Sequence, residues 1–245
     1  MNLVAHKHLK LPDDKRLFII GDLHGCWDLY KKGTKILGID NDDIVISLGD
    51  LVDRGPEAFK CVLEFTRKEN RYAIMGNHEH MLVKGMLDGD RSYYECWYQN
   101  GGHVLWDQFE EEGVTLIATM LENLPVIITV EYRGMMLAFA HGGWCAQVGQ
   151  YSPYELGSLL TKKNNEKILE AIMWDRDSIG CAMEEYPIGD VKDVDYIFHG
   201  HSYVKEPIIH HNRVYMDTGN CFNGNLTFAS FDKRDLWFYS TLEED

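Results

Sequence analysis

The chain has little of what a nucleic-acid-binding or membrane-surface protein needs. Its 245 residues include 24 Lys and Arg against 39 Asp and Glu, for a formal net charge of −15. Binding along DNA, RNA or an anionic membrane requires a basic face, so this deficit of positive charge disfavours all three as partners. It does not exclude anionic substrates, because bound divalent metals can reverse the field locally.

Paired cysteines and long apolar runs are also missing. The six cysteines are widely spaced, none forms a Cys-x-x-Cys pair, and nothing marks one as a nucleophile. The first residues, MNLVAHKHLKLPDDK, contain no apolar signal-peptide core. The chain also lacks the run of about 18 uncharged apolar residues that would span a membrane. We therefore expect a cytoplasmic protein with free thiols.

No repeat, linker or low-complexity segment divides the chain. A length of 245 residues suits one large domain, whose core is ample without disulfides or a structural metal. We expect residues 1–245 to form a single catalytic domain with cap-like insertions at about 81–123 and 143–193.

Five short apolar runs end abruptly in glycine or in a residue type that binds metals. They cover residues 17–20, 44–48, 72–75, 135–140 and 196–198. Their length and composition are typical of buried strands. Segments with helical spacing separate the first three runs, which predicts a βαβαβ unit with parallel strands. Because ligands of such sheets bind at the carboxyl ends of the strands, we expect the polar residues there to form a site.

The remainder of the chain predicts more helices and a second sheet. Residues 81–123 have a mostly helical pattern, and residues 151–190 are irregular apart from a helix near 166–173. Near the C-terminus, alternating segments predict antiparallel strands at 214–217, 226–231 and 236–239. The expected fold is an α/β sandwich in which two mixed β-sheets are flanked by helices.

The side chains that follow the strands suit a dinuclear metal centre. They are Asp22, His24, Asp50, Asn77, His141 and His201. Carboxylate, imidazole and amide ligands together suit Mn²⁺, Fe or Zn²⁺ better than Ca²⁺. Six ligands are too many for one catalytic ion with open positions, whereas two ions about 3.5–4 Å apart can share a carboxylate. Asp50 is the candidate bridge, with Asp22 and His24 on one ion and the other three on the second.

Three ordered motifs resemble the phosphoprotein phosphatase family of metallophosphoesterases. They are Gly21-Asp22-Leu23-His24-Gly25, Gly49-Asp50-Leu51-Val52-Asp53-Arg54-Gly55 and Gly76-Asn77-His78-Glu79. The resemblance extends over about residues 17–231, to enzymes of the lambda bacteriophage type, through segments such as Trp174-Asp175-Arg176 and Asp217-Thr218-Gly219. It implies a calcineurin-like metallophosphoesterase sandwich with two divalent ions, for which Mn²⁺ is the first choice.

The resemblance also implies roles at four further positions. His78 would be the general acid that protonates the leaving oxygen, and Asp53 would hold its imidazole and favour the protonated form. Arg54 and Arg176 would bind phosphate oxygens, for which a planar guanidinium is suited. An activated water would then attack phosphorus in line, without a phosphoenzyme intermediate.

Some positions have no single interpretation. Asp217 could support the site or only cap a turn, and Glu79 completes a motif without a role that the sequence reveals. His199 and His201 would face the same side of a regular strand. We choose His201 as the ligand and expect His199 to pack, because lambda-type enzymes carry an aromatic residue at position 199.

Two departures from the lambda-type pattern bear on the substrate. Gly142-Gly143 stands where those enzymes have Ala-Asp, and Asp175 stands where they have Asn. The second change adds a negative charge beside Arg176, which could alter the substrates that the site accepts.

These observations predict a metal-dependent phosphomonoesterase that needs no obligate partner. The resemblance favours a protein-Ser/Thr phosphatase, of broad specificity, acting on phosphoproteins or small phosphomonoesters. The alternative is a symmetrical dinucleoside tetraphosphate hydrolase, which shares the motifs but cleaves a phosphoanhydride. Cyclic nucleotide phosphodiesterases usually carry Gly-His-x-His, whereas this chain has Gly200-His201-Ser202-Tyr203. A binding protein without turnover would be expected to have lost metal ligands, and all six are present.

Overall fold

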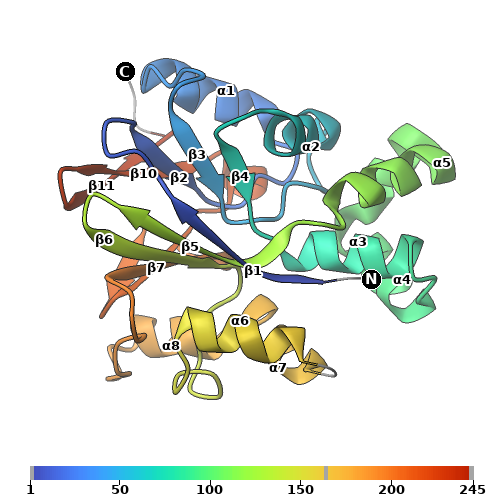
Figure 1. Cartoon of the computed structure of the whole chain (residues 1–245). Helices are drawn as coiled ribbons and strands as arrows, with labels where there is room; N and C mark the ends of the chain where they lie inside the picture. Colours follow the sequence, from blue (N-terminus) through green and yellow to red (C-terminus); the bar gives the residue numbers. More distant parts are fainter. Residues whose placement is uncertain (1–2, 163–164, 243–245) are drawn as a thin grey trace.

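The fold consists of two β-sheets packed face to face, with helices outside them (Figure 1). The computed structural model describes residues 3–162 and 165–242. The strand order is β1-β5-β6-β7-β9-β8 in the six-stranded sheet and β11-β10-β2-β3-β4 in the five-stranded sheet. Each sheet combines parallel and antiparallel pairs. The expectation of an α/β sandwich with two mixed sheets flanked by helices is therefore confirmed.

Strands and helices follow one another along the whole described chain. The six-stranded sheet contains β1 (Val4–Lys10), β5 (Pro125–Tyr132), β6 (Met135–Ala140), β7 (Tyr196–Tyr203), β8 (Ile208–His210) and β9 (Arg213–Asp217). The five-stranded sheet contains β2 (Leu17–Ile20), β3 (Ile44–Ser47), β4 (Arg71–Ala73), β10 (Thr227–Asp232) and β11 (Asp235–Ser240). The helices are α1 (Trp27–Ile36), α2 (Ala58–Arg67), α3 (Asn77–Met86), α4 (Arg91–Trp97), the π-helical turn η1 (Tyr98–Gly102), α5 (His103–Leu121), α6 (Pro153–Thr161), α7 (Glu166–Met173), α8 (Asp177–Met183) and α9 (Asn220–Asn223).

Alternation along the strands divides the core into two parts. In β2, Leu17 and Ile19 belong to the apolar cluster between the two sheets. Phe18 and Ile20 belong instead to the cluster that includes Tyr30 of α1. A slip of one residue would exchange these two faces, so burial of both faces fixes the register of the strand.

The carboxyl ends of strands from both sheets meet at one edge of the sandwich. β2, β3 and β4 are parallel neighbours, as the predicted βαβαβ unit requires. In the other sheet, β6 and β7 are also parallel neighbours. The segments that follow these strands carry the polar residues of the three motifs and His141. Both sheets therefore contribute side chains to the same place.

Several elements differ from the sequence-based expectations. The segment 151–190, expected to be irregular around one helix, contains α6 and α8 besides α7. β9 was expected among antiparallel strands, but it pairs in parallel with β7 and only β8 lies antiparallel to it. β1 and β8 were not predicted, because the sequence of β1, VAHKHLK, has too few apolar residues to indicate a strand.

Two other expectations concern thiols and membranes. All six cysteines are free thiols, as expected. Among the described residues, no helix combines the length and apolar composition that crossing a membrane requires.

A tight contact between α1 and β10 leads to a stability prediction. A Cβ added at Gly33 would lie 2.2 Å from the ring of Phe228. Replacing Gly33→Ala should therefore destabilise the protein by about 2 kcal/mol through overpacking, despite the better helix propensity of alanine. Gly180→Ala in α8 is the matched control, because nothing lies within 4 Å of the added atom. Urea unfolding measures both, and equal stability of the two variants would contradict this account of the contact.

Candidate metal centre

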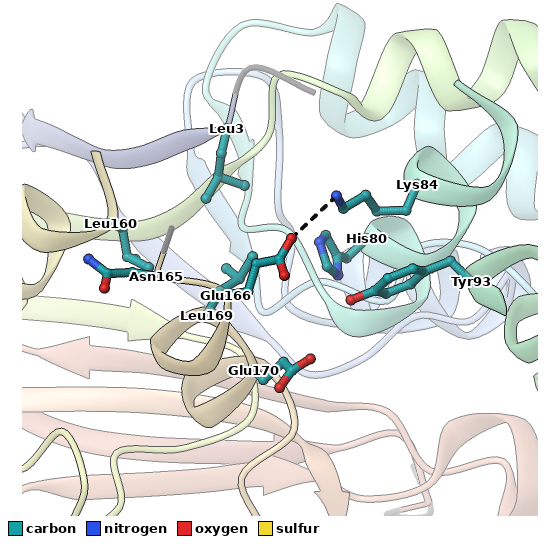
Figure 2. Close-up of a pocket in the computed structure, with 9 residues that line it drawn as sticks. All are labelled: Leu3, His80, Lys84, Tyr93, Leu160, Asn165, Glu166, Leu169 and Glu170. Carbon is teal, nitrogen blue, oxygen red and sulfur yellow. Dashed lines mark ion pairs between the residues drawn. The ribbon is translucent and has the colours of Figure 1, made fainter. Parts of the chain in front are cut away.

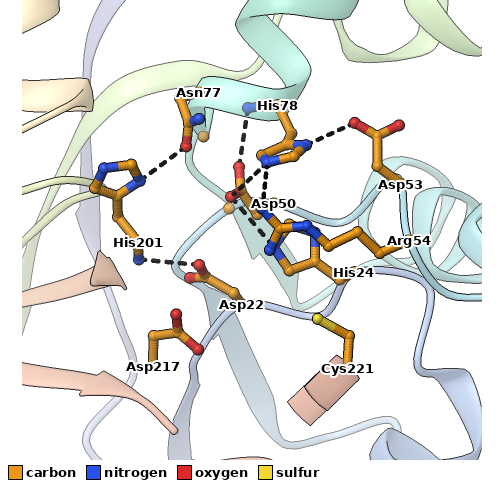
Figure 3. A network of polar contacts seen from close by, with 12 residues as sticks. Asp22, His24, Asp50, Asp53, Arg54, Asn77, His78, His201, Asp217 and Cys221 are labelled. Atoms are coloured by element: carbon orange, nitrogen blue, oxygen red, sulfur yellow. Dashed lines mark hydrogen bonds and ion pairs between the residues drawn. The ribbon is translucent and has the colours of Figure 1, made fainter. Parts of the chain in front are cut away.

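Asp50 lies at the centre of a buried cluster of carboxylates and imidazoles (Figure 3). Its Oδ2 is 3.5 Å from His24 Nε2, and its Oδ1 is 3.4 Å from His141 Nε2. Ligand atoms of Asp50, His24 and His78 lie within 4.8 Å of one another, and so do those of Asp50, His141 and His201. Asp50 belongs to both groups, which is the position a carboxylate shared by two ions would occupy.

Asn77 and Asp22 connect the cluster to the two histidines of the six-stranded sheet, His141 and His201. Asn77 Oδ1 lies 2.8 Å from His141 Nε2 and 3.0 Å from His201 Nδ1. Asp22 Oδ2 accepts a hydrogen bond from the backbone N–H of His201 at 2.9 Å. The other carboxylate oxygen of Asp22, and Nε2 of His201, are buried without a hydrogen-bond partner among the described residues. Buried polar atoms of this kind need a partner, and a cation suits the carboxylate oxygen.

Backbone carbonyls orient two of the imidazoles. His24 Nδ1 lies 2.9 Å from the carbonyl of Val52, and His141 Nδ1 lies 2.6 Å from the carbonyl of Leu48. Each carbonyl accepts from an Nδ1–H, so the Nε2 of each ring faces the cluster. This arrangement is typical of metal-binding histidines, whose other nitrogen donates to an acceptor outside the site.

The electrostatics of the cluster also call for a cation. Burial and then Asp217 raise the pKa of Asp22 well above its usual range. Burial by itself would lower the pKa of His141, but Asp50 and Asp22 raise it to about 10. A proton on His141 thus compensates two buried carboxylates, and divalent ions would replace it with a larger positive charge. The residues present therefore fit a metal centre.

His78 and Asp53 form a hydrogen-bonded pair beside this cluster. His78 Nδ1 lies 2.7 Å from Asp53 Oδ2, and Trp97 Nε1 donates to Asp53 Oδ1 at 2.9 Å. Burial alone would lower the pKa of His78, but Asp50 and Asp53 more than offset it and raise the pKa. Asp50 and Asp53 thus act in favour of the protonated imidazole, whereas the nearby Arg54 acts against it. The sequence motifs gave no signal for Trp97, which comes from α4 and fixes the Asp53 carboxylate.

The two candidate phosphate-binding arginines differ in position. Arg54 Nη1 lies 2.6 Å from His24 Nε2, and its Nη2 lies 3.0 Å from His78 Nε2. Arg176 is exposed at the N-terminus of α8, near enough to His201 to contribute to the lowering of its pKa, after burial and His141. The structure thus gathers nine of the ten predicted site residues into one cluster and places Arg176 at its rim.

Glu79, for which the sequence suggested no role, connects the second motif, residues 49–55, with the third, residues 76–79. Its carboxylate accepts from the backbone N–H groups of Asp50 (2.8 Å), Leu51 (2.7 Å), Val52 (3.2 Å) and Gly76 (2.9 Å). It is fully buried in the first turn of α3. Glu79 therefore holds the segment after β3 against the start of α3, which carries Asn77 and His78.

Left-handed backbone conformations are concentrated in the cluster. Positive φ angles occur at His24 (42°), Asp50 (48°), Asp53 (71°), Arg54 (64°) and His201 (63°). Each costs a non-glycine residue of the order of 1 kcal/mol, and such strain collects where surrounding contacts impose it at functional sites. Here the contacts include the bonds from the N–H groups of residues 23 and 24 to the carbonyl of Asp50, at 3.1 and 2.6 Å.

A break in β7 separates His199 from His201. The pairing register with β9 shifts between residues 199 and 203. Because His201 has a positive φ, its side chain does not take the direction that it would have in a regular strand. His199 Nδ1 instead lies 2.7 Å from the carbonyl of Ala140, and its ring stacks on Tyr215. His199 therefore packs in the core, as we expected.

The two departures from the lambda-type pattern lie against each other. A Cβ at Gly143 would be 2.2 Å from Asp175 Oδ2, so only glycine leaves room for this carboxylate. Asp175 accepts from the N–H groups of residues 177 and 178, at 3.1 and 3.2 Å, and from the Ser178 hydroxyl. Its charge thus caps the start of α8, beside Arg176.

A pocket of about 210 Å³ lies between α3, α4 and α7 (Figure 2). The residues that line it include His80, Lys84, Tyr93 and Glu166. His80 is buried, and neither of its ring nitrogens has a hydrogen-bond partner among the described residues.

The contacts of Glu79 give a testable prediction. Replacing Glu79→Gln turns one acceptor into an N–H donor that faces backbone N–H groups. We expect a loss of about 2 kcal/mol or more in the free energy of unfolding, because buried donors lose their acceptor. Glu112→Gln in α5 is exposed and serves as the matched control. Unchanged stability of the Glu79 variant would show that the Glu79 carboxylate does not hold the two segments together.

Comparison with known proteins agrees with this geometry. The chain is 26% identical over 227 residues to a serine/threonine-protein phosphatase 1 of Salmonella typhimurium, covering 91% of this chain and 95% of that protein. It is 29% identical over 242 residues to an asymmetrical bis(5'-nucleosyl)-tetraphosphatase of Anoxybacillus flavithermus, covering 89% and 91%. The name of this relative specifies asymmetrical cleavage, whereas our alternative from the sequence was a symmetrical enzyme.

Similarity in structure and at the family level points the same way. A solved protein serine/threonine phosphatase from Saccharomyces cerevisiae superimposes with a TM-score of 0.66 at 12% identity, covering 98% of this chain and 83% of that one. Residues 15–205 match the calcineurin-like phosphoesterases. The chain therefore belongs to the calcineurin-like phosphoesterase family, as its three motifs had led us to expect.

Proposed function

We propose that the protein is a metal-dependent phosphomonoesterase that hydrolyses phosphate esters directly. The observation that carries this proposal is the position of Asp50, which belongs both to the group with His24 and His78 and to the group with His141 and His201. His78, the candidate proton donor, lies near Asp50 and contacts Arg54. When bound, two divalent ions supply the positive charge that activates a water and neutralises the phosphate.

Six residues would hold the ions. Asp50 would be shared by both ions, Asp22 and His24 would complete one position, and Asn77, His141 and His201 would complete the other. Mixed oxygen and imidazole ligands favour Mn²⁺, with Fe and Zn²⁺ as alternatives. The unpartnered oxygen of Asp22 and the carbonyl-oriented imidazoles support this assignment.

The proton for the leaving group would come from His78. Asp53 keeps its imidazole oriented and charged, so that Nε2 can donate to the ester oxygen as the bond to phosphorus breaks. Arg54 lies beside the same nitrogen and would bind non-bridging phosphate oxygens, with Arg176 closing from the rim. No side-chain nucleophile takes part.

The preferred substrates are phosphoproteins, with phosphoserine and phosphothreonine first, and small phosphomonoesters. Relatives named serine/threonine-protein phosphatases span nearly the full chain, which supports this choice. Relatives named asymmetrical tetraphosphatases match at similar identity and favour dinucleoside tetraphosphates as the second candidate.

A direct comparison of substrates tests the proposal. The protein with Mn²⁺ is incubated with a phosphoserine or phosphothreonine peptide, p-nitrophenyl phosphate and diadenosine tetraphosphate at equal concentrations. We expect phosphate release from the first two to be faster than nucleotide release from the third. Faster cleavage of the tetraphosphate would replace the phosphomonoesterase by the second candidate.

Replacing His78→Asn tests the proton donor. We expect a larger loss of kcat on alkyl phosphates than on aryl phosphates, because an aryl oxide leaves with little help from a proton. General acid catalysis contributes about 10²–10⁴-fold to alkyl ester hydrolysis. Equal losses on the two classes would assign His78 a different role.

Replacing Asp50→Asn tests the shared ligand. Metal analysis of the dialysed protein should show a lower Mn²⁺ content together with loss of turnover, since both ions depend on this carboxylate. Asp28→Asn, an exposed residue of α1, is the control and should retain metal and activity. If the Asp50 variant keeps two ions per chain, Asp50 is not the bridge.

A further inference from the structure

Two exposed aromatic side chains contact residues of the candidate site, and a third lies against the loop that follows Asp217. Phe222 is 76% exposed, Tyr203 is 52% exposed and Trp174 is 36% exposed. The Trp174 ring lies edge-on to His201, 5.8 Å between centroids. The Tyr203 ring lies against Gly219, where a Cβ would be 2.8 Å from it. Single exposed apolar residues are ordinary, but exposed aromatic side chains grouped beside a functional site indicate a binding surface.

Phe222 is the member of this group that contacts a candidate phosphate-binding residue. The Arg54 guanidinium carbon lies 5.3 Å from the centre of its ring. Cys221, the preceding residue, lies beside Arg54 in Figure 3. The Arg54 guanidinium therefore has the Phe222 ring over one face, while its nitrogens approach His24 and His78.

The position of Phe222 is fixed by α9 rather than by burial of its ring. The helix is bracketed by Gly219 and Gly224, with φ of 79° and 78°, and the N–H of Phe222 donates to the Gly219 carbonyl at 2.9 Å. The Asn220 amide donates to the carbonyls of Asp22 and Leu23, at 2.7 Å each. The helix that carries the ring is thus attached to the first motif, which fixes the backbone of Phe222 and reduces the entropy cost of using its side chain for binding.

The chemistry of the leaving group explains what such a ring could contact. If Arg54 binds the phosphate and His78 protonates the ester oxygen, the leaving group emerges beside the guanidinium that the Phe222 ring covers. An aryl ester has its ring directly on that oxygen, so the ring can stack against Phe222. A seryl ester places a methylene and then peptide backbone there, which offers much less apolar contact.

We propose that Phe222 is the wall of an aryl subsite, which adds contact with an aromatic leaving group, such as that of phosphotyrosine, at a site that also accepts phosphoserine and phosphothreonine. This inference rests on the proposed phosphomonoesterase function and specifies its substrate class. Aromatic pairs contribute about 0.5–1.5 kcal/mol beyond area burial, which corresponds to roughly two- to tenfold in kcat/KM.

Peptides of one sequence that carry either phosphotyrosine or phosphoserine test the subsite. For Phe222→Ala, the ratio of kcat/KM on the two peptides should shift roughly two- to tenfold against phosphotyrosine, mainly through KM. Phe222→Tyr should restore the ratio, and Phe222→Leu should not. Tyr186→Ala, which removes a 59% exposed aromatic elsewhere, is the control and should leave the ratio unchanged. An unchanged ratio in Phe222→Ala would overturn the proposal.

A binding measurement separates this inference from the proposed function. Phenylphosphonate and methylphosphonate carry the same phosphonate group, with a phenyl ring on phosphorus in the first and a methyl group in the second. Calorimetry on the Mn²⁺-loaded protein compares their affinities without hydrolysis. We expect Phe222→Ala to weaken phenylphosphonate more than methylphosphonate. If the wild-type protein hydrolyses neither the peptides nor p-nitrophenyl phosphate, the proposed function fails, and the phosphonate pair still decides the subsite. Equal weakening of both phosphonates would remove the subsite even where the phosphatase activity stands.

Discussion

The arrangement of the site depends on one buried carboxylate, that of Glu79. Four backbone N–H groups from two motifs converge on it, and it places the segment carrying Asp50 against the helix start that carries Asn77 and His78. A buried charge is costly unless it is fully hydrogen-bonded. Because Glu79 accepts hydrogen bonds from backbone N–H groups that would otherwise be unpaired, it offsets the strain of the left-handed conformation of Asp50. The positions of Asp50, Asn77 and His78 relative to one another follow from this contact.

Much of the fold followed from the sequence, and the exceptions have physical reasons. Buried runs that stop at Gly-Asp or Gly-Asn predicted β2, β3 and β4, because apolar composition and turn chemistry agree there. β1 was missed because its side chains are mostly polar or half-exposed, and its position depends on parallel pairing with β5. The parallel pairing of β9 with β7 was missed because it is tertiary and leaves no local pattern.

The candidate site was predictable where a side chain bears metal-binding chemistry and unpredictable where it acts through a backbone or a neighbour. Asp22 and His141 were recognisable from residue type and position after a strand. Trp97 and Asn220 were not, because an indole N–H on Asp53 and an amide on two carbonyls are visible only when distant segments come together. The break in β7 that separates His199 from His201 is likewise a backbone event.

The hydrogen bond between the His201 N–H and Asp22 joins residues 179 positions apart. Under the ligand assignment proposed above, the N-terminal part of the chain, which emerges first during synthesis, carries a complete set of ligands for only one ion position. His141 and His201 follow much later. Contacts between such distant residues form late in folding, because closing a long loop costs conformational entropy. Under that assignment, a nascent chain would complete its second ion position only when nearly all of the protein has left the ribosome, which delays phosphoesterase chemistry until folding is almost complete.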